Sequence, residues 1–271
     1  MPLRLPMSLR LPGRAAIRGV ILDVDGVLEF AGQVYPGAVE TLAHLRQRGL
    51  AVCFLTNSTL KSRASAAERL RRRGFQVAPE EIITASYATA SYLREQNPRS
   101  CLVLLEGEGR REFDGLPQNH ERPEYVVVGH DSRALNFDGM NRALALLLNG
   151  ARLVGMQSEL VDHSSGTPQL NVGSWAGMLA RAAGVEATYV GKPAAYAFNL
   201  ALRTLGLGPE QALMVGDKVS TDIAGANAAG IRSVLLRTGE FDERELAGSV
   251  RPDHVLDAFR DLPALLDEIA S

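Results

Sequence analysis

The sequence predicts an α/β protein built on a doubly wound parallel sheet, with a smaller α/β domain inserted into it. Short uninterrupted apolar runs are typical of parallel strands that are buried on both faces. Each run is followed by a segment of helical length, and several of these segments end at a glycine. This strand–helix rhythm occurs near the beginning and near the end of the chain, and about 100 residues with a cycle of their own separate the two parts.

The first part of the predicted core contains two strands and two helices. Residues 19–22 and 51–55 are apolar runs that predict buried strands. Helices are expected over residues 36–48 and 60–73, and a glycine follows each of them directly. Strand, helix, strand and helix in this order are typical of a parallel sheet with helical crossovers.

The same rhythm returns late in the chain. Strands are expected over residues 212–215 and 233–236, and helices over residues 194–205, 220–229 and 258–269. The intervening stretch predicts helices over residues 87–96, 138–149 and 174–183, and strands over residues 101–105, 125–128 and 153–156. This is enough structure for a second, smaller α/β domain.

These patterns divide the chain into three parts. Residues 17–85 and 187–271 are assigned to the core, and residues 86–186 to the inserted domain. Residues 1–16 are expected to form a disordered tail, because prolines interrupt any helix there and no continuous apolar segment replaces it.

Composition restricts the class of protein. The formal net charge of -2 shows no basic excess, so we expect no nucleic-acid partner. No apolar run reaches the roughly 18 residues that a membrane span needs. Cys53 and Cys101 lie in apolar strand segments and predict buried thiols, which suit a reducing cytoplasm.

The first predicted strand ends in a pair of acids, Asp23 and Asp25. Carboxylates two residues apart at a strand end can point into one site, and their oxygens suit a hard cation such as Mg²⁺. One carboxylate can attack phosphorus, and the other can move a proton to and from the leaving oxygen. Alternatively, the two acids cap the segment that follows.

Polar residues also follow the second predicted strand, in the sequence Thr56-Asn57-Ser58. A hydroxyl group and backbone N–H groups at the start of a helix form a cradle for an anion such as phosphate. The alternative is a simple helix cap, in which Ser58 or Thr59 accepts a hydrogen bond from the first helical turn.

Lys192 stands directly before a helix that is expected to begin at Pro193. A lysine in this place can reach a phosphoryl oxygen and offset its charge. Taken alone, it can equally be a solvated surface residue.

Asp217 and Asp222 follow the apolar run of residues 212–215. Asp217 would complete the protein ligands of a cation. Asp222 lies in the first turn of the expected helix, where an acid is favourable, and can orient Lys192 or accept a hydrogen bond from metal-bound water. In open α/β sheets ligands bind at the carboxyl ends of the strands, so all four polar segments should meet in one crevice.

In this order, and each at a strand end, the four segments resemble the motifs of the haloacid dehalogenase-like hydrolase superfamily. The position of the insertion is similar to the C2-type cap of its NagD and nitrophenylphosphatase-like branch. The resemblance implies a phosphatase that forms an aspartyl-phosphate on Asp23, with Asp25 as acid and base. It also implies Mg²⁺ bound by Asp23, Asp217 and the backbone carbonyl of Asp25. Thr56 with its neighbours would hold the phosphoryl group, and Lys192 would stabilise its charge.

Other functions share part of this pattern. Receiver domains also phosphorylate an aspartate, but they are about half this length and leave the insertion unexplained. A dehalogenase would attack carbon with the same aspartate, which Asp25 argues against. A non-catalytic protein that binds a phosphorylated ligand is a further alternative.

The substrate is not specified by the sequence. The resemblance implies a small phosphorylated substrate, and it leaves a homodimer formed through the cap open. Residues 157–172 should face the site as a cap loop, but they contain no pattern that indicates one substrate.

Overall fold

The computed structural model describes residues 16–162 and 167–270. Most of the predicted tail (residues 1–15) and residues 163–166 of the expected cap loop lie outside the described residues.

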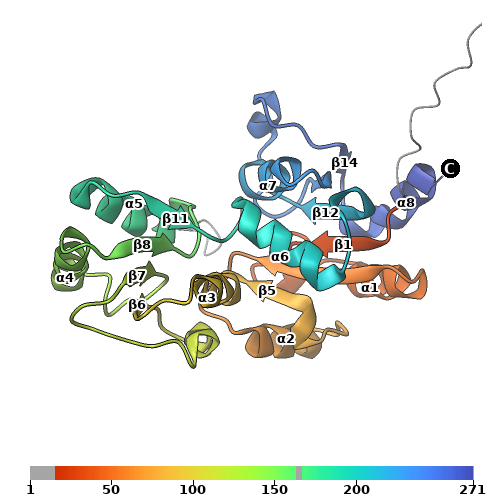
Figure 1. Cartoon of the computed structure of the whole chain (residues 1–271). Coiled ribbons are helices and arrows are strands. Elements are labelled where there is room, and N and C mark those ends of the chain that lie inside the picture. Colours follow the sequence, from red (N-terminus) through yellow and green to blue (C-terminus); the bar gives the residue numbers. More distant parts are fainter. Residues whose placement is uncertain (1–15, 163–166, 271) are drawn as a thin grey trace, which may run out of the picture.

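A parallel sheet forms the centre of the larger unit (Figure 1). The described chain contributes six strands to it, in the order β14 (His254–Leu256), β13 (Arg232–Leu236), β12 (Ala212–Gly216), β1 (Gly19–Leu22), β4 (Ala51–Thr56) and β5 (Ile82–Thr84). All neighbouring strands run parallel. The prediction of a doubly wound α/β core is confirmed.

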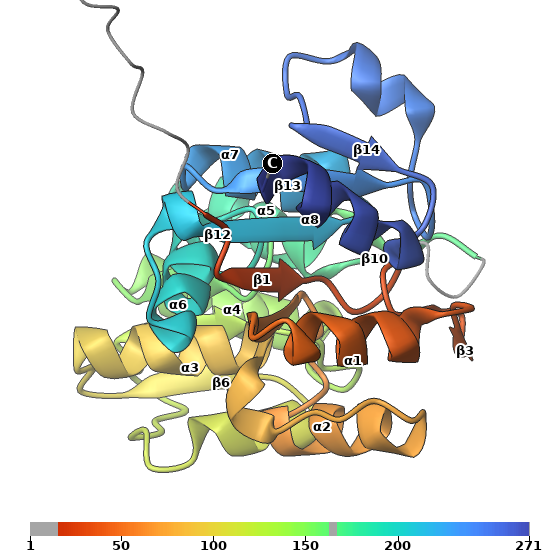
Figure 2. The same cartoon turned by 90° about the vertical axis from the view of Figure 1, so that its right-hand side faces the viewer.

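Helices cover both faces of this sheet. The helices on one face are α1 (Ala38–Gln47), α2 (Arg63–Arg72) and α8 (Leu262–Ala270), and those on the other are α3 (Ala85–Gln96), α6 (Ala195–Leu205) and α7 (Ala224–Ala228). Strand β1 shows why: Val20 and Leu22 pack with the first group, whereas Ile21 packs with the second. Successive side chains of a strand point to opposite faces, so a fully apolar strand needs cover on both. Figure 2 shows α1 and α8 in front of the sheet.

The smaller unit, the cap, has its own parallel sheet. Within the described residues its strands are ordered β11 (Ala187–Tyr189), β8 (Arg152–Gly155), β7 (Tyr125–Val128) and β6 (Cys101–Leu104). Helices α4 (Phe137–Leu148) and α5 (Val172–Ala183) pack on it. Two short hairpins complete the fold: β2 (Glu29–Phe30) with β3 (Gln33–Val34), and β9 (Val161–Asp162) with β10 (Gln169–Leu170).

Several short elements were not expected from the sequence. Strands β5 and β11 have three residues each and pass almost directly into a neighbouring helix or turn, so they give no apolar run of ordinary strand length. Helix α3 packs against β5 and α6 of the core although the predicted boundary places it in the inserted domain. Strand β11 lies beyond the predicted boundary at residue 186 but pairs with β8 of the cap.

The expected helix over residues 220–229 is divided in two. Val219–Ile223 forms a single π-helical turn, and α7 follows it directly. The other short turns are 3₁₀ helices at Pro79–Glu81, Glu108–Phe113, Pro209–Gln211, Glu243–Ala247 and Phe259–Asp261. Among the helices that the structure describes, none combines the length and apolar character of a membrane-crossing segment. Cys53 and Cys101 are both buried free thiols.

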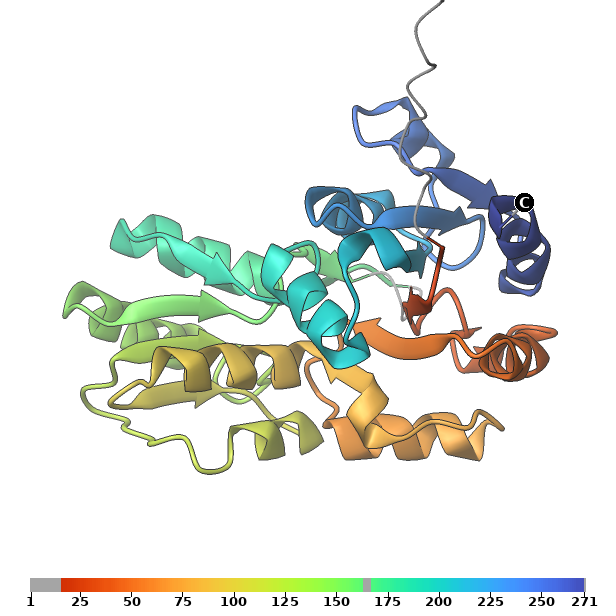
Figure 3. The same ribbon diagram turned by 45° about the vertical axis from the view of Figure 1, so that its right-hand side comes forward.

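The two sheets lie side by side, and the strands of the cap point toward the core (Figure 3). The loops that follow β1, β4 and β12 therefore meet the loop that follows β8. A cleft of about 440 Å³ lies between them.

Candidate active site

Asp23 lies at the floor of this cleft, directly after β1. Its backbone N–H donates to the carbonyl of Val215 in the neighbouring strand, at 2.9 Å. Lys192 reaches it from the loop before α6, and its Nζ lies 2.8 Å from Asp23 Oδ1 and 2.7 Å from Asp222 Oδ1. The Lys192 residue is 2% exposed and Asp222 is fully buried, so this ammonium is held between two carboxylates and out of bulk water.

Asp222 is fixed by a second donor. Its Oδ2 accepts a hydrogen bond from the backbone N–H of Lys218 at 3.1 Å, while its other oxygen accepts from Lys192. A buried carboxylate is stable only when it is paired and hydrogen-bonded, and Asp222 meets both conditions. Its contact with Lys192 is the arrangement expected from the sequence.

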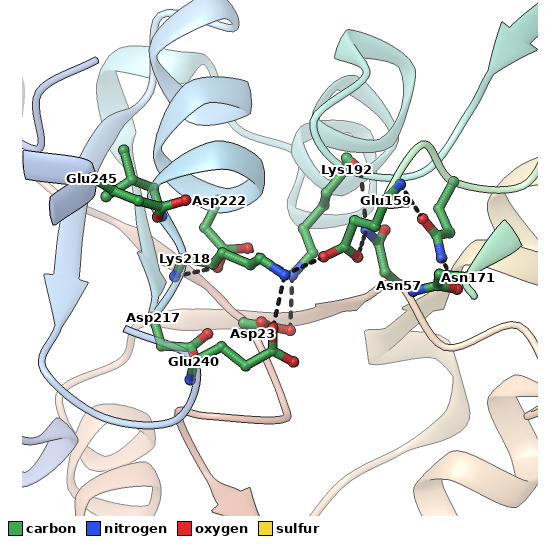
Figure 4. Close-up of polar contacts among 12 residues, drawn as sticks. Asp23, Asn57, Glu159, Asn171, Lys192, Asp217, Lys218, Asp222, Glu240 and Glu245 are labelled. Carbon is green, nitrogen blue, oxygen red and sulfur yellow. Dashed lines mark hydrogen bonds and ion pairs between the residues drawn. The ribbon is translucent and has the colours of Figure 1, made fainter. Parts of the chain in front are cut away.

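Asp217 brings a third acid to the site. It follows β12, is 3% exposed, and accepts a hydrogen bond on Oδ2 from the backbone N–H of Glu240 at 2.6 Å. Within the described chain, one ligand oxygen from each of Asp23, Asp217 and Asp222 can be chosen so that all lie within 4.8 Å of one another. Figure 4 shows Asp23 and Asp222 beside Lys192, with Asp217 to one side of them.

This concentration of charge alters the acidity of the groups. Burial raises the pKa of the Asp23 carboxyl well above its ordinary value, and repulsion from Asp222 and Asp217 adds to this, although Lys192 opposes it. Burial and the neighbouring Asp222 raise the pKa of Asp217 to about 7. Burial works to lower the pKa of Lys192, but the two carboxylates outweigh it and raise that pKa. The raised pKa values of Asp23 and Asp217 indicate that Lys192 alone does not neutralise the acid cluster.

The residues fit a divalent cation. Hard oxygen ligands from carboxylates are what such ions prefer, and one ion would offset the repulsion among the acids. The surrounding backbone also leaves Asp217 little freedom. Gly26 has φ +91°, and a Cβ atom there would lie 2.0 Å from Asp217 Oδ2.

Asp25 also lines the cleft, but it is not among the three acids that cluster within 4.8 Å of one another. Asp25 Oδ1 lies 2.9 Å from a guanidinium nitrogen of Arg69 on α2, and the Asp25 side chain is 48% exposed. Arg69 also pairs with Glu29, a fully buried acid that lies 2.6 Å from Arg73 Nε. The side chain of Asp25 is therefore oriented by α2, which the sequence did not suggest.

Thr56 ends β4, and its hydroxyl oxygen accepts a hydrogen bond from the backbone N–H of Ser58 at 3.2 Å. Asn57 Nδ2 donates at 3.0 Å to the backbone carbonyl of Lys192, which joins two of the predicted segments. The alternative in which Ser58 or Thr59 caps the following helix is wrong, and so is the expected start of that helix at residue 60. Helix α2 begins at Arg63, because Ser62 and Ser65 form a capping box there.

The cap contributes Glu159, a residue that sequence analysis placed in the cap loop but gave no role. Its carboxylate accepts from Asn57 Nδ2 at 3.0 Å and pairs with Lys218 Nζ at 2.6 Å. Lys218 also pairs with Glu240 at 2.8 Å (Figure 4). The proximity of Lys218 to Asp217 was a signal for a site residue, but nothing in the sequence indicated that Glu159 would meet it.

Comparison with known proteins agrees with this architecture. A family model described as haloacid dehalogenase-like hydrolase matches residues 20–116, and a HAD-hydrolase-like model matches residues 189–262. Human phospholysine phosphohistidine inorganic pyrophosphate phosphatase is 33% identical over 242 residues, which cover 87% of each chain.

Solved structures show the same fold. The p-nitrophenyl phosphatase from Archaeoglobus fulgidus superposes with a TM-score of 0.87 at 30% identity, over 93% of this chain and 100% of that one. NagD from E. coli K-12 superposes with a TM-score of 0.84 at 28% identity, over 91% and 98%. The chain belongs to the haloacid dehalogenase-like hydrolases, in the branch that contains NagD and the p-nitrophenyl phosphatases.

Proposed function

We propose that this enzyme is a Mg²⁺-dependent phosphatase that hydrolyses small phosphorylated metabolites through an aspartyl-phosphate on Asp23. The observation that carries the proposal is the buried ammonium of Lys192, held at 2.8 Å from Asp23 and 2.7 Å from Asp222 at the floor of a cleft. A phosphoryl group that reaches Asp23 would meet this ammonium at once. Positioning and charge neutralisation are the main needs of phosphoryl transfer.

The reaction has two steps. A carboxylate oxygen of Asp23 attacks phosphorus, the bond between phosphorus and the leaving oxygen breaks, and Asp25 gives a proton to that oxygen. Asp25 then takes a proton from water, whose oxygen attacks phosphorus and releases Asp23 with inorganic phosphate. Asp25 suits this role because its half-exposed carboxylate lines the cleft outside the acid cluster.

The phosphoryl oxygens would be held by Lys192, the hydroxyl of Thr56 and the loop that continues through Asn57 and Ser58. Thr56 and Ser58 line the cleft, and Asn57 is tied to the carbonyl of Lys192. Asp23, Asp217 and the backbone carbonyl of Asp25 would hold Mg²⁺, which neutralises negative charge on the phosphoryl group when bound.

The named relatives support this proposal. One is phospholysine phosphohistidine inorganic pyrophosphate phosphatase, and another is a p-nitrophenyl phosphatase. The cap covers the cleft and would restrict access to small substrates. A homodimer formed through the cap and residence in the cytoplasm stay predictions.

The test is phosphate release from a panel of phosphorylated metabolites and p-nitrophenyl phosphate, with and without Mg²⁺, for the wild type and Asp23→Asn. We expect release to require both Mg²⁺ and Asp23, with a loss of about 10⁴-fold or more in Asp23→Asn. Asp267→Asn is the control, because Asp267 is an exposed acid on α8 that does not line the cleft. Acid quenching during turnover should trap phosphate on wild-type protein only.

Equal release by the wild type and Asp23→Asn would contradict Asp23 as nucleophile. Trapped phosphate without turnover would favour the signalling alternative.

A further inference from the structure

The lysines and arginines that line the cleft are each paired with two acids. Within the described residues they are Lys192, Lys218 and Arg69. Lys192 pairs with Asp23 and Asp222, and Lys218 pairs with Glu159 and Glu240. Arg69 likewise pairs with two acids, Asp25 and Glu29.

Acids outnumber these cations on the walls of the cleft. The acidic residues that line it, among those described, are Asp23, Asp25, Glu159, Asp162, Asp217 and Glu240. A bound divalent cation and Lys192 would both be used by the phosphoryl group of the substrate. A second anionic group on the same substrate would then meet acids, and lysines and an arginine that are already paired. The other ionisable side chain on the described wall is His130, whose Nε2 lies 3.9 Å from Glu106.

Glu159 places negative charge on the cap side of the cleft, above the floor that holds the phosphoryl group. Its side chain is 18% exposed, and its contacts with Asn57 and Lys218 hold it against the core. The backbone around it is also anchored, because its carbonyl accepts from the N–H of Gly173 at 3.0 Å in the first turn of α5. Lys218 is shared between Glu159 and Glu240, so these three groups together keep a net negative charge. Charge that is partly buried is screened little by solvent.

Apart from Asp162 and His130, the other polar side chains that the cap contributes to the described cleft wall are neutral. Gln157 is 2% exposed, its Nε2 donates to Asn171 Oδ1, and both residues line the cleft. Gln169 lies beside them on the cleft wall. Amide groups of this kind hydrogen-bond hydroxyl groups without supplying a charge for a carboxylate.

We infer that the substrate is a phosphate ester of an uncharged or cationic hydroxylated compound, and that Glu159 makes the cleft discriminate against esters that carry a carboxylate. The inference rests on the proposed phosphatase activity. It concerns the part of the substrate that leaves, whereas the proposed function concerns the phosphoryl group.

Three small phosphoesters of nearly equal size test how the charge of the leaving part of the substrate affects binding and turnover. Phosphoglycolate, 2-hydroxyethyl phosphate and phosphoethanolamine end in a carboxylate, a hydroxyl and an ammonium group. Each is measured in two ways with the full chain and Mg²⁺: as a substrate, by kcat/KM, and as a competitor of p-nitrophenyl phosphate hydrolysis, by its inhibition constant. The competition assay reports binding even for an ester that is turned over slowly.

We expect phosphoglycolate to be at least about tenfold poorer than 2-hydroxyethyl phosphate by either measure, and phosphoethanolamine to equal or exceed the hydroxyl ester. Glu159→Gln keeps an acceptor for Asn57 but removes the charge, so it should narrow the gap between carboxylate and hydroxyl esters by about threefold or more. Glu186→Gln is the matched control. Glu186 is an exposed cap acid directly before β11, at the end of the cap sheet away from the cleft, and its substitution should leave the ratio unchanged.

The outcomes are separable. If p-nitrophenyl phosphate is hydrolysed but phosphoglycolate binds or reacts as well as the hydroxyl ester, the charge inference is overturned and the proposed function stands. The inference is also overturned if Glu159→Gln and Glu186→Gln shift the ratio equally, or if none of the three esters competes. If p-nitrophenyl phosphate itself is not hydrolysed, the proposed function fails, and the inference with it.

Discussion

The two walls of the cleft are built differently. The core wall holds Lys192 and Asp222, which are 2% and 0% exposed and bonded to each other. The cap wall holds Glu159, whose side chain is 18% exposed and comes from a loop rather than a strand end. The core residues are fixed by the parallel sheet, while the cap residues are fixed by contacts made across the cleft.

This difference indicates a division of labour. Groups that contact the phosphoryl group must serve every substrate, so a change in the core wall should lower all activities by the same factor. Groups on the cap wall contact only the part that leaves, so a change there should alter the ratio between substrates.

After substitution of Asp23, the proposed nucleophile, the largest effect is expected for Lys192→Met. The methionine retains most of the side-chain volume but removes the ammonium between Asp23 and Asp222. We expect kcat to fall by about 10²–10⁴-fold, by a similar factor for p-nitrophenyl phosphate and for aliphatic esters. Unequal factors would show that Lys192 contacts the leaving group and would break the division between the walls.

Lys192→Met also leaves buried carboxylates unpaired, so its thermal unfolding must be measured. We expect a loss of about 3 kcal/mol in the free energy of unfolding. Lys192→Arg keeps the charge and separates the two effects: it should recover stability more fully than activity.

Gly26→Ala should damage the core wall through the backbone. Gly26 has φ +91°, and an added Cβ would lie 2.0 Å from Asp217 Oδ2. The variant must displace Asp217, so we expect a loss of about 2–4 kcal/mol in stability and weaker activation by Mg²⁺. Gly49→Ala is the control, because Gly49 has φ +75° but nothing within 4 Å of its added Cβ.

Gly49→Ala should therefore report the cost of the left-handed conformation alone, about 1–2 kcal/mol. Thermal unfolding and Mg²⁺ titration of both variants measure the difference. If the two variants lose equal stability and retain equal Mg²⁺ activation, the close packing around Asp217 has no functional effect.

The acid cluster predicts a pH-dependent stability in the metal-free protein. The pKa of Asp217 is raised from 3.8 to about 7, chiefly by burial. Between these values the folded protein holds a proton that the unfolded chain has lost. Stability from this group is present below about pH 4 and is lost as the pH rises toward about 7.

Mg²⁺ requires the deprotonated carboxylate, so it should raise Tm more at pH 8 than at pH 5.5. Asp217→Asn removes the charge, and we expect its metal-free form to be several degrees more stable than wild type at pH 8, with no stabilisation by Mg²⁺. Calorimetry with EDTA or Mg²⁺ measures both. Equal Mg²⁺ stabilisation at the two pH values would contradict this assignment.

The core wall was also the more predictable one. Asp23 and Asp217 each follow an apolar strand, and Thr56 is the last residue of another. Parallel strands bring their carboxyl ends to one edge, so the meeting of these residues follows from local pattern and topology. Asp222 was predictable for the same reason, since it lies five residues beyond Asp217 in the turn that follows β12.

The cap wall left no such pattern. Glu159 contacts Lys218, which is 59 positions away in the sequence. Glu159 lies in a loop that is followed by a strand of only two residues, so no hydrophobic periodicity could predict this contact. The start of α2 was misplaced for a different reason. Ser58, Thr59 and Ser62 are all residue types that favour caps. Thr59 has Ser62 three residues later just as Ser62 has Ser65, so residue type and spacing alone did not decide where the capping box forms.

The smallest of the expected effects concerns Asp25, which lines the cleft and is paired with Arg69 of α2. Its carboxylate pairs with Arg69 at 2.9 Å, while Arg73 pairs with Glu29 and does not pair with Asp25. Arg69→Gln should therefore release Asp25, whereas Arg73→Gln should disturb the buried Glu29 and the Gly32 carbonyl, to which Arg73 also donates, but not Asp25. Both variants leave Glu29 with one arginine, so they are matched in their effect on packing.

If Arg69 positions Asp25 for proton transfer, the effect of Arg69→Gln depends on how much the leaving group needs a proton. We expect kcat for aliphatic esters to fall by about threefold to tenfold, and kcat for p-nitrophenyl phosphate to change little, because p-nitrophenolate leaves readily without a proton. Arg73→Gln should lower both rates equally or not at all. An equal fall for both esters in Arg69→Gln would make Arg69 a structural residue only, and Asp25 would then act independently of α2.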